Sequence, residues 1–232
     1  MHLKAEQLSL SHGEWTLSAD GVFGQGVHLV TGPVGSGKTT LASALAGIFE
    51  PASGRITHEG ISRLSLSMQF PEYHVTGFLV KDEIRSWHLP VTETLQKTGL
   101  TGRQDRKTLT LSRGELKRLH LTCLLGSPWD AVILDEPFAG LDCMEKRRVC
   151  TAIEEKTHPI TIIFTHEQAV LPAADVIWEI EGNALVCRGR VPEAIPAWKG
   201  APQYLTRALE EGARPENIRL QDATEALCRM HA

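Results

Sequence analysis

The chain has 232 residues, 42% of them hydrophobic, so it is long enough to bury a substantial core in one large domain or two small ones. Its 24 Lys and Arg residues stand against 28 Asp and Glu residues, and the net charge of −4 lacks the strong basic excess of proteins that neutralise nucleic-acid phosphates. We therefore predict no nucleic-acid partner, although this composition leaves a local basic patch open.

The sequence shows no membrane-spanning or metal-binding pattern of its own. No apolar run approaches the roughly 18 to 20 residues that span a bilayer, and the N-terminal MHLKAEQ carries no secretory hydrophobic region. Any membrane role is therefore expected to come through a partner. The five cysteines are odd in number and lack C-x-x-C spacing, which is typical of reduced thiols in a cytosolic protein. We predict no structural metal site, because no Cys/His cluster has ligand spacing.

Short apolar runs alternate with helical patterns along most of the chain. Five runs are predicted to be strands, and several are apolar throughout, as expected for strands covered by helices on both faces. These are residues 27–31, 64–70, 131–134, 160–164 and 176–180. A helix is predicted over 39–49. The alternation predicts an α/β fold with a mainly parallel sheet, in which ligands usually bind beyond the carboxyl ends of the strands.

Two regions depart from this alternation. Between about residues 80 and 127 the apolar pattern becomes helical, which predicts an inserted helical subdomain. After residue 189 several prolines mark an irregular connection, and short helices are predicted at 204–211 and 223–230. We therefore expect a main domain over residues 1–188 and a C-terminal tail over 189–232.

The pattern G-x-x-x-x-G-K-[ST] lies between a predicted strand and a predicted helix, the context in which it indicates a phosphate-binding loop. Its residues are Gly32, Pro33, Val34, Gly35, Ser36, Gly37, Lys38 and Thr39, and Thr40 follows. The glycines let backbone N–H groups and the helix N-terminus face phosphates, while Lys38 adds positive charge and Thr39 offers a hydroxyl to Mg²⁺. The alternative, a glycine-rich turn with an exposed lysine, is disfavoured by the complete pattern.

Two carboxylates, Asp135 and Glu136, follow the apolar run at 131–134. We assign Asp135 to Mg²⁺ through water, because this ion keeps part of its hydration shell, and Glu136 to polarising the attacking water. An isolated acidic pair at a strand end is as often a solvated turn, but the phosphate loop in the same chain favours the functional interpretation.

The segment LSRGE at 111–115 precedes a helical run. Ser112 and Glu115 match the S-x-x-E capping box, so a helix cap is one interpretation. A capped helix N-terminus with free N–H groups also suits a γ-phosphate. The segment alone does not decide between the two.

Taken in order, six motifs resemble the full series of an ABC transporter ATPase subunit. They are the phosphate loop, Gln69, and the segments 111–115, 132–136, 139–142 (AGLD) and 164–166 (FTH). The resemblance covers the chain to about residue 189 and implies a P-loop NTPase core of the ABC ATPase type. Within that superfamily, QFPEY at 69–73 and VKDEI at 80–84 resemble energy-coupling-factor and cobalt or vitamin-uptake ATPases.

The resemblance also implies roles for single residues. Gln69 would contact Mg²⁺ and the lytic water, and His166 would bond the γ-phosphate and orient that water. Without the other motifs, Gln69 would be interpreted as a surface glutamine and His166 as an ordinary histidine at a strand end. Ser112 and Gly114 would meet the ATP of a partner subunit, and Asp142 would lie at the interface between the two subunits.

Two positions depart from the family pattern. The signature, usually L-S-G-G-Q, has Arg113 for its first glycine and Glu115 for its glutamine, which adds bulk and charge beside Ser112. At the place of an adenine-stacking aromatic, the segment 8–12 ends in His12, our first candidate, with Trp15 as the second.

The implied function is an ATP-hydrolysing subunit, with ATP and Mg²⁺ as cofactors, that powers an energy-coupling-factor-like importer of a vitamin, a transition-metal ion or a similar micronutrient. It would pair with a second ATPase subunit, identical or different, with residues 189–232 as a candidate dimer contact. It would bind integral membrane subunits at the cytoplasmic face of the cell membrane. The alternatives are a soluble ABC ATPase in metal-cluster assembly or DNA repair, and a phosphate-loop kinase.

Overall fold

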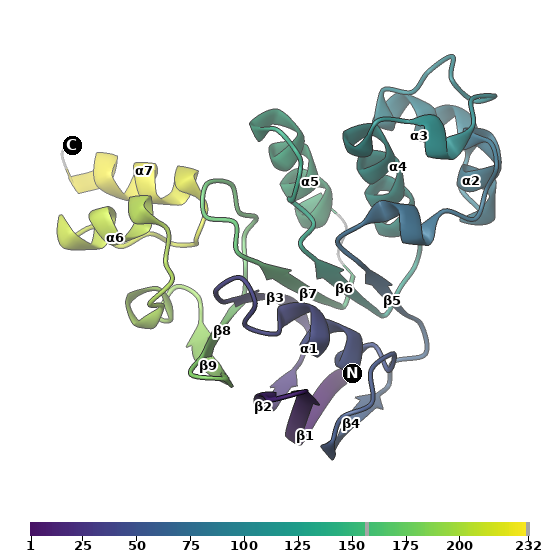
Figure 1. Cartoon of the computed structure of the whole chain (residues 1–232). Coiled ribbons are helices and arrows are strands. Elements are labelled where there is room, and N and C mark those ends of the chain that lie inside the picture. The colour runs from purple at the N-terminus through teal and green to yellow at the C-terminus, as the bar shows by residue number, and fades with distance from the viewer. Residues whose placement is uncertain (156–157, 231–232) are drawn as a thin grey trace.

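The computed structural model describes residues 1–155 and 158–230, and within them nine strands form one sheet in the order β4-β1-β2-β9-β8-β3-β7-β6-β5 (Figure 1). The strands are β1 (His2–His12), β2 (Trp15–Phe23), β3 (Gly26–Thr31), β4 (Ser53–Glu59), β5 (Leu64–Ser67), β6 (Ala131–Asp135), β7 (Ile160–Thr165), β8 (Val176–Glu181) and β9 (Ala184–Arg190). The α-helices are α1 (Lys38–Leu45), α2 (Val80–Ser86), α3 (Val91–Thr98), α4 (Arg113–Gly126), α5 (Cys143–Glu155), α6 (Gln203–Glu210) and α7 (Leu220–Met230).

Five neighbouring strands, β8, β3, β7, β6 and β5, run parallel, as the sequence predicts. The register pairs Thr31 of β3 with Thr165 of β7, and Asp135 of β6 with Phe164 of β7. The segments that follow these three strands therefore leave the sheet at the same edge. An antiparallel group, β4-β1-β2, completes one side of the sheet.

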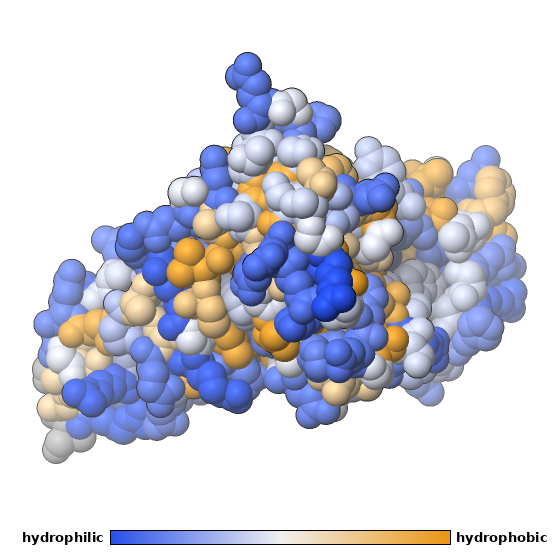
Figure 2. All heavy atoms as spheres, turned by 90° about the horizontal axis from the view of Figure 1, so that it is seen from below, coloured by the Kyte–Doolittle hydropathy of each residue, from blue (hydrophilic) through white to orange (hydrophobic). Residues whose placement is uncertain are grey.

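The sheet is covered on both faces. On one face, core side chains from β3, β6, β7 and β8 pack with α4, α5, α6 and α7. On the other, they pack with α1 and with the alternating buried residues of β1 and β2. Polar side chains cover most of the outer surface seen from below in Figure 2, and apolar ones lie among them in small groups. In the described part of the chain, no helix is long and apolar enough to cross a membrane.

The helices α2, α3 and α4 gather beyond the β5 edge of the sheet (Figure 1) and share a core cluster of their own. Its buried members are Val80, Ile84, Leu95, Leu100, Leu111, Leu116, Leu119 and Cys123. Since α4 also contributes residues to the cluster on the sheet, this one helix belongs to both cores. It therefore connects the helical region with the core that packs on the sheet.

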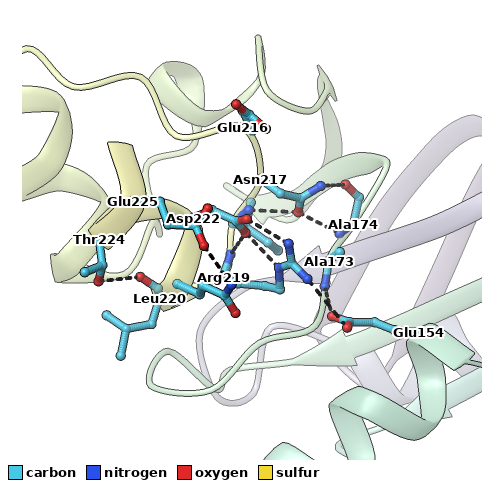
Figure 3. Close-up of polar contacts among 12 residues, drawn as sticks. Glu154, Ala173, Ala174, Glu216, Asn217, Arg219, Leu220, Asp222, Thr224 and Glu225 are labelled. Carbon is cyan, nitrogen blue, oxygen red and sulfur yellow. Dashed lines mark hydrogen bonds and ion pairs between the residues drawn. The ribbon is translucent and has the colours of Figure 1, made fainter. Parts of the chain in front are cut away.

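The segment after β9 folds back onto the central sheet. The indole Nε1 of Trp198 donates a hydrogen bond of 2.9 Å to Thr31 Oγ1, on the last residue before the phosphate loop. Arg219, just before α7, lies between Asp222 of that helix and Glu154 of α5, and Asn217 bonds to the backbone of Ala174 (Figure 3). Polar contacts and a shared apolar core thus join α6 and α7 to the main sheet.

Several predicted bounds differ from the structure. The helix predicted over 39–49 ends at Leu45, because Gly47 adopts a left-handed φ of 75° that stops it. The strand predicted over 64–70 ends at Ser67, and α7 begins at Leu220 rather than at residue 223. The sequence analysis missed β1, β2, β4, β9 and α5. In β1 and β2 buried residues alternate with more exposed ones, whereas β4, β9 and α5 bury few residues and so carry little apolar signal.

Replacing Trp198 tests whether the tail and the sheet unfold together. Trp198→Ala empties a fully packed position and removes the bond to Thr31, so we expect it to lower the free energy of unfolding by about 3 to 5 kcal/mol. A denaturant titration should still show one transition for the whole chain. Leu220→Ala, at a position that is 47% exposed, should cost less than about 1 kcal/mol. A separate early transition that Trp198→Ala alone shifts would contradict this prediction.

Candidate functional site

The phosphate loop connects β3 to α1 and is held by its own lysine. Gly37 adopts a left-handed φ of 94° directly before the helix, a conformation that glycine reaches without steric penalty. Lys38 is buried, and its Nζ donates to the carbonyl oxygens of Gly32 at 2.9 Å and Pro33 at 3.0 Å. Burial lowers the pKa of Lys38, while the carboxylates of Glu136 and Asp135 oppose that shift. The two carbonyl groups therefore hold the Lys38 ammonium group against the loop.

The Trp15 ring packs directly against the phosphate loop. A Cβ atom added to Gly37 would lie 2.1 Å from that ring, so any side chain at this position would displace the indole. His12, at the end of β1, is exposed. Both side chains line the cavity beside the loop. Trp15, the second candidate for stacking on adenine, is thus the one that contacts the loop.

Asp135 lies at the end of β6 beside Thr39. Its Oδ2 accepts a hydrogen bond of 2.8 Å from Thr39 Oγ1, whereas its buried Oδ1 has no hydrogen-bond partner in the described part of the chain. Burial raises the pKa of this carboxyl group, since nothing nearby fully compensates its charge. An unpaired buried carboxylate oxygen next to a hydroxyl fits a divalent cation with oxygen ligands, as Mg²⁺ requires.

Glu136 follows at a strained backbone position. Its φ is 49°, in the left-handed region that non-glycine residues rarely occupy. Its carboxylate accepts from Thr165 Oγ1 at 3.2 Å and lies 2.7 Å from the Nδ1 of His166 and 3.7 Å from the Nζ of Lys38. Because an ionised carboxylate only accepts, Nδ1 carries the proton, and Nε2 remains available on the half-exposed ring. The geometry holds a carboxylate, an imidazole and an ammonium together.

These groups surround a cavity of about 370 Å³. It is lined by His12, Trp15, Val34, Gly35, Gly37, Lys38, Thr39, Thr40, Gln69, Glu136 and His166. Gly32 and Pro33 line a neighbouring cavity of similar volume, together with His166. The structure therefore brings most of the sequence-derived site residues to one place, while Ser112 and Gly114 do not line either cavity.

The segment around Ser112 forms a capping box at the start of α4. The Ser112 hydroxyl accepts from the N–H of Glu115, and the Glu115 carboxylate accepts from the N–H of Ser112. The guanidinium of Arg113 lies over the Phe70 ring, 4.8 Å from its centroid, which is within cation–π distance. Asp142 Oδ1 accepts from the N–H of Glu145 at the start of α5. Each of these side chains thus has a contact within its own chain.

The sequence analysis missed two features beside the site. The buried ammonium of Lys117 on α4 donates to the carbonyl oxygens of Gln69 at 3.4 Å, Glu136 at 2.6 Å and Ala139 at 3.2 Å. The rings of His74 and His120 stack with centroids 4.3 Å apart. The sequence did carry a signal for both features, because Lys117 and His120 stand among the leucines of a predicted helix. Such residues are rarely buried unless they have partners.

The comparisons with known proteins agree on one family. The family described as ABC transporter matches residues 22–139. A thiamine import ATP-binding protein of a Jannaschia species is 30% identical, over 71% of this chain and 82% of its own. The chain belongs to the ABC transporter family of ATP-binding proteins. A sulfate/thiosulfate import ATP-binding protein of Mycobacterium tuberculosis is also 30% identical, over 70% of this chain, but this chain spans only about half, 51%, of that relative's length.

Two further similar proteins belong to the same broad group of ABC and energy-coupling factor proteins. An energy-coupling factor transporter ATP-binding protein of Symbiobacterium thermophilum is 27% identical over 73% of this chain and 67% of its own. The solved structure of a bacterial Atm1-family ABC exporter with ATP bound superposes with a TM-score of 0.68 at 17% identity, over 80% of this chain and 38% of its own. At that identity the superposition shows the ABC ATPase fold.

The buried ring of His120 in the stacked pair is expected to make the stability of this ABC chain depend on pH. Burial lowers the pKa of His120 to about 3, and the charges of His74 and Lys117 add to the shift. In the unfolded chain the pKa returns to about 6.5. The unfolded state therefore binds more protons below that pH, so stability that is present above pH 6.5 is lost as the pH falls. This group alone is expected to lower the free energy of unfolding by up to about 1.4 kcal/mol per pH unit.

Urea titrations at pH 7, 6 and 5 measure this effect. His120→Leu removes the titrating ring from a buried position, so its stability should fall less steeply with decreasing pH than that of the wild type. His88→Asn changes an exposed histidine whose left-handed φ of 57° asparagine tolerates, and it should keep the wild-type slope. Parallel pH profiles for wild type and His120→Leu would contradict the assignment.

Proposed function

We propose that this chain is the ATP-hydrolysing subunit of an energy-coupling-factor-like ABC importer of a micronutrient such as a vitamin or a transition-metal ion. The observation that carries the proposal is the cavity in which Lys38, Glu136 and His166 meet beside the phosphate loop of an ABC family member. The names of relatives that import thiamine or sulfate, or that belong to an energy-coupling factor transporter, support the transport role.

In this proposal the phosphates of ATP bind the loop, where backbone N–H groups, the start of α1 and Lys38 offset their charge. Glu136 accepts a proton from the attacking water, and the bond from His166 Nδ1 orients its carboxylate. The Nε2 of His166 then faces the γ-phosphate. Thr39, Asp135 and Gln69 would hold Mg²⁺, which supplies positive charge to the phosphates when it is bound. The adenine would stack on Trp15 or His12 at the mouth of the cavity.

The hydrolytic assignment predicts different effects at two positions. Lys38→Ala should weaken ATP binding, because it removes the buried ammonium from the loop. Glu136→Gln should keep ATP binding but slow hydrolysis by about 10² to 10⁴-fold, since the amide cannot accept the proton. Phosphate release and ATP binding are measured on the same preparations, with Glu59→Gln, an exposed carboxylate on β4, as the control. Wild-type turnover in Glu136→Gln would refute its role as the base.

The proposed partners are a second ATPase subunit and integral membrane subunits. The second subunit would present its ATP to Ser112 and Gly114, which lie at an exposed helix start away from this chain's own cavity. The membrane subunits would dock beside the exposed aromatic side chains of Phe70, Tyr73 and Phe78. Aromatic residues that are exposed in a single chain and flanked by charges are typical of protein interfaces.

Tyr73→Ala tests the docking surface. Tyr73 is 71% exposed, so its loss should leave folding and ATP binding unchanged while it reduces co-purification of a multi-spanning membrane protein and the coupling of hydrolysis to transport. Ile48→Ala, at an equally exposed apolar position (67%) after α1, is the matched control and should have no effect. Identifying the retained membrane proteins and their small molecule also tests the cargo class. Normal assembly and transport in Tyr73→Ala would remove this surface from the proposal.

A further inference from the structure

Lys117 occupies an unusual position for a charged side chain. It lies in the first half of α4, five residues after Ser112, and only 3% of its surface is exposed. Within the described residues, all three of its hydrogen-bond acceptors are backbone carbonyl oxygens. Burial lowers its pKa to about 8, and the charge of Glu136 only partly opposes this shift. Burying a cation without a directly paired carboxylate is costly, so packing alone does not explain a lysine here.

The three carbonyl groups belong to two segments of the proposed catalytic site, the loop after β5 and the turn between β6 and α5. Gln69 lies in the loop between β5 and the helical region. Glu136 carries the carboxylate that contacts His166. Ala139 lies in the turn that leads to Asp142 and α5, and its N–H also bonds to the carbonyl oxygen of Glu136. One ammonium group therefore ties α4 to both segments.

The contact with Glu136 bears directly on the direction of its carboxylate. A non-glycine residue with a left-handed φ is strained by about 1 kcal/mol or more, and it persists only when its surroundings hold it. The Glu136 N–H bonds to the carbonyl of Phe164 at 2.8 Å, and its carbonyl accepts from Lys117 at 2.6 Å. Both ends of this strained residue are therefore anchored, one to β7 and the other to α4.

We propose that Lys117 is a positioning residue for hydrolysis, whose ammonium transmits the position of α4 to Gln69, Glu136 and Ala139. The inference rests on the proposed ATPase function. A movement of α4, the helix that Ser112 caps, would then move the carbonyl group of Glu136 and change where its carboxylate points. Since misplacing a reacting group by about 1 Å costs up to about 10²-fold in rate, this link is strong enough to switch hydrolysis.

Steady-state ATP hydrolysis by the full chain, with the subunits it co-purifies with, tests the proposal. Lys117→Met keeps an unbranched side chain but loses every donor. We expect kcat to fall by about 10- to 100-fold while KM for ATP changes by less than about 3-fold, because the phosphate loop is untouched. Lys117→Arg retains a charged donor group and should restore more of kcat than Lys117→Gln. Trp129→Phe, which removes a hydrogen bond to Leu124 near the other end of α4, is the control for helix stability and should keep kcat.

Equal kcat in Lys117→Met and Trp129→Phe at matched thermal stability would overturn the inference, as would equal losses of kcat and ATP affinity. If Lys117→Met does not fold, Lys117→Gln carries the test, and wild-type kcat in that folded variant would overturn the inference as well. A wild-type chain that binds no ATP or does not hydrolyse it would instead overturn the proposed function itself. The two failures are therefore distinguishable.

Discussion

The parallel pairing of β3, β7 and β6 is the constraint on which the candidate site depends. Because Thr31 is level with Thr165 and Asp135 is level with Phe164, the phosphate loop, the acidic pair and His166 leave the sheet together. These strands are buried on both faces, so their positions are determined by packing as well as by hydrogen bonds. A shift of one residue in β6 would turn Glu136 away from His166, since alternate side chains point to opposite faces.

Two buried ammonium groups act on the same site in similar ways. Lys38 donates to carbonyl oxygens of the phosphate loop, and Lys117 donates to those of Gln69, Glu136 and Ala139. Each ammonium group offsets the cost of burial with backbone acceptors, and both lie near the carboxylates of Asp135 and Glu136. Positive charge therefore surrounds the acidic pair from the loop on one side and from the helical region on the other.

The helical region meets the sheet through polar and aromatic contacts as well as through the leucines of α4. His120 of α4 stacks on His74, and its Nε2 lies 3.0 Å from Ser67 Oγ at the end of β5. His74 Nε2 accepts from the N–H of Met68, the residue before Gln69. At the helix start, Arg113 lies over Phe70. His120 and Arg113 thus join α4 to the segment that follows β5.

The sequence by itself determined the family, the phosphate loop, the acidic pair and the five central strands, because each depends on a local pattern. A fully apolar run needs no partner to be recognised, and G-x-x-x-x-G-K-[ST] specifies its own turn. Only the tertiary structure decided that the Trp15 ring lies on Gly37, that Lys117 reaches two loops and that Arg113 contacts Phe70. The half-buried strands β1 and β2 belong with these, since their alternating residues become a core face only once α1 packs against them. These features depend on which distant segments meet, and no local pattern encodes that pairing.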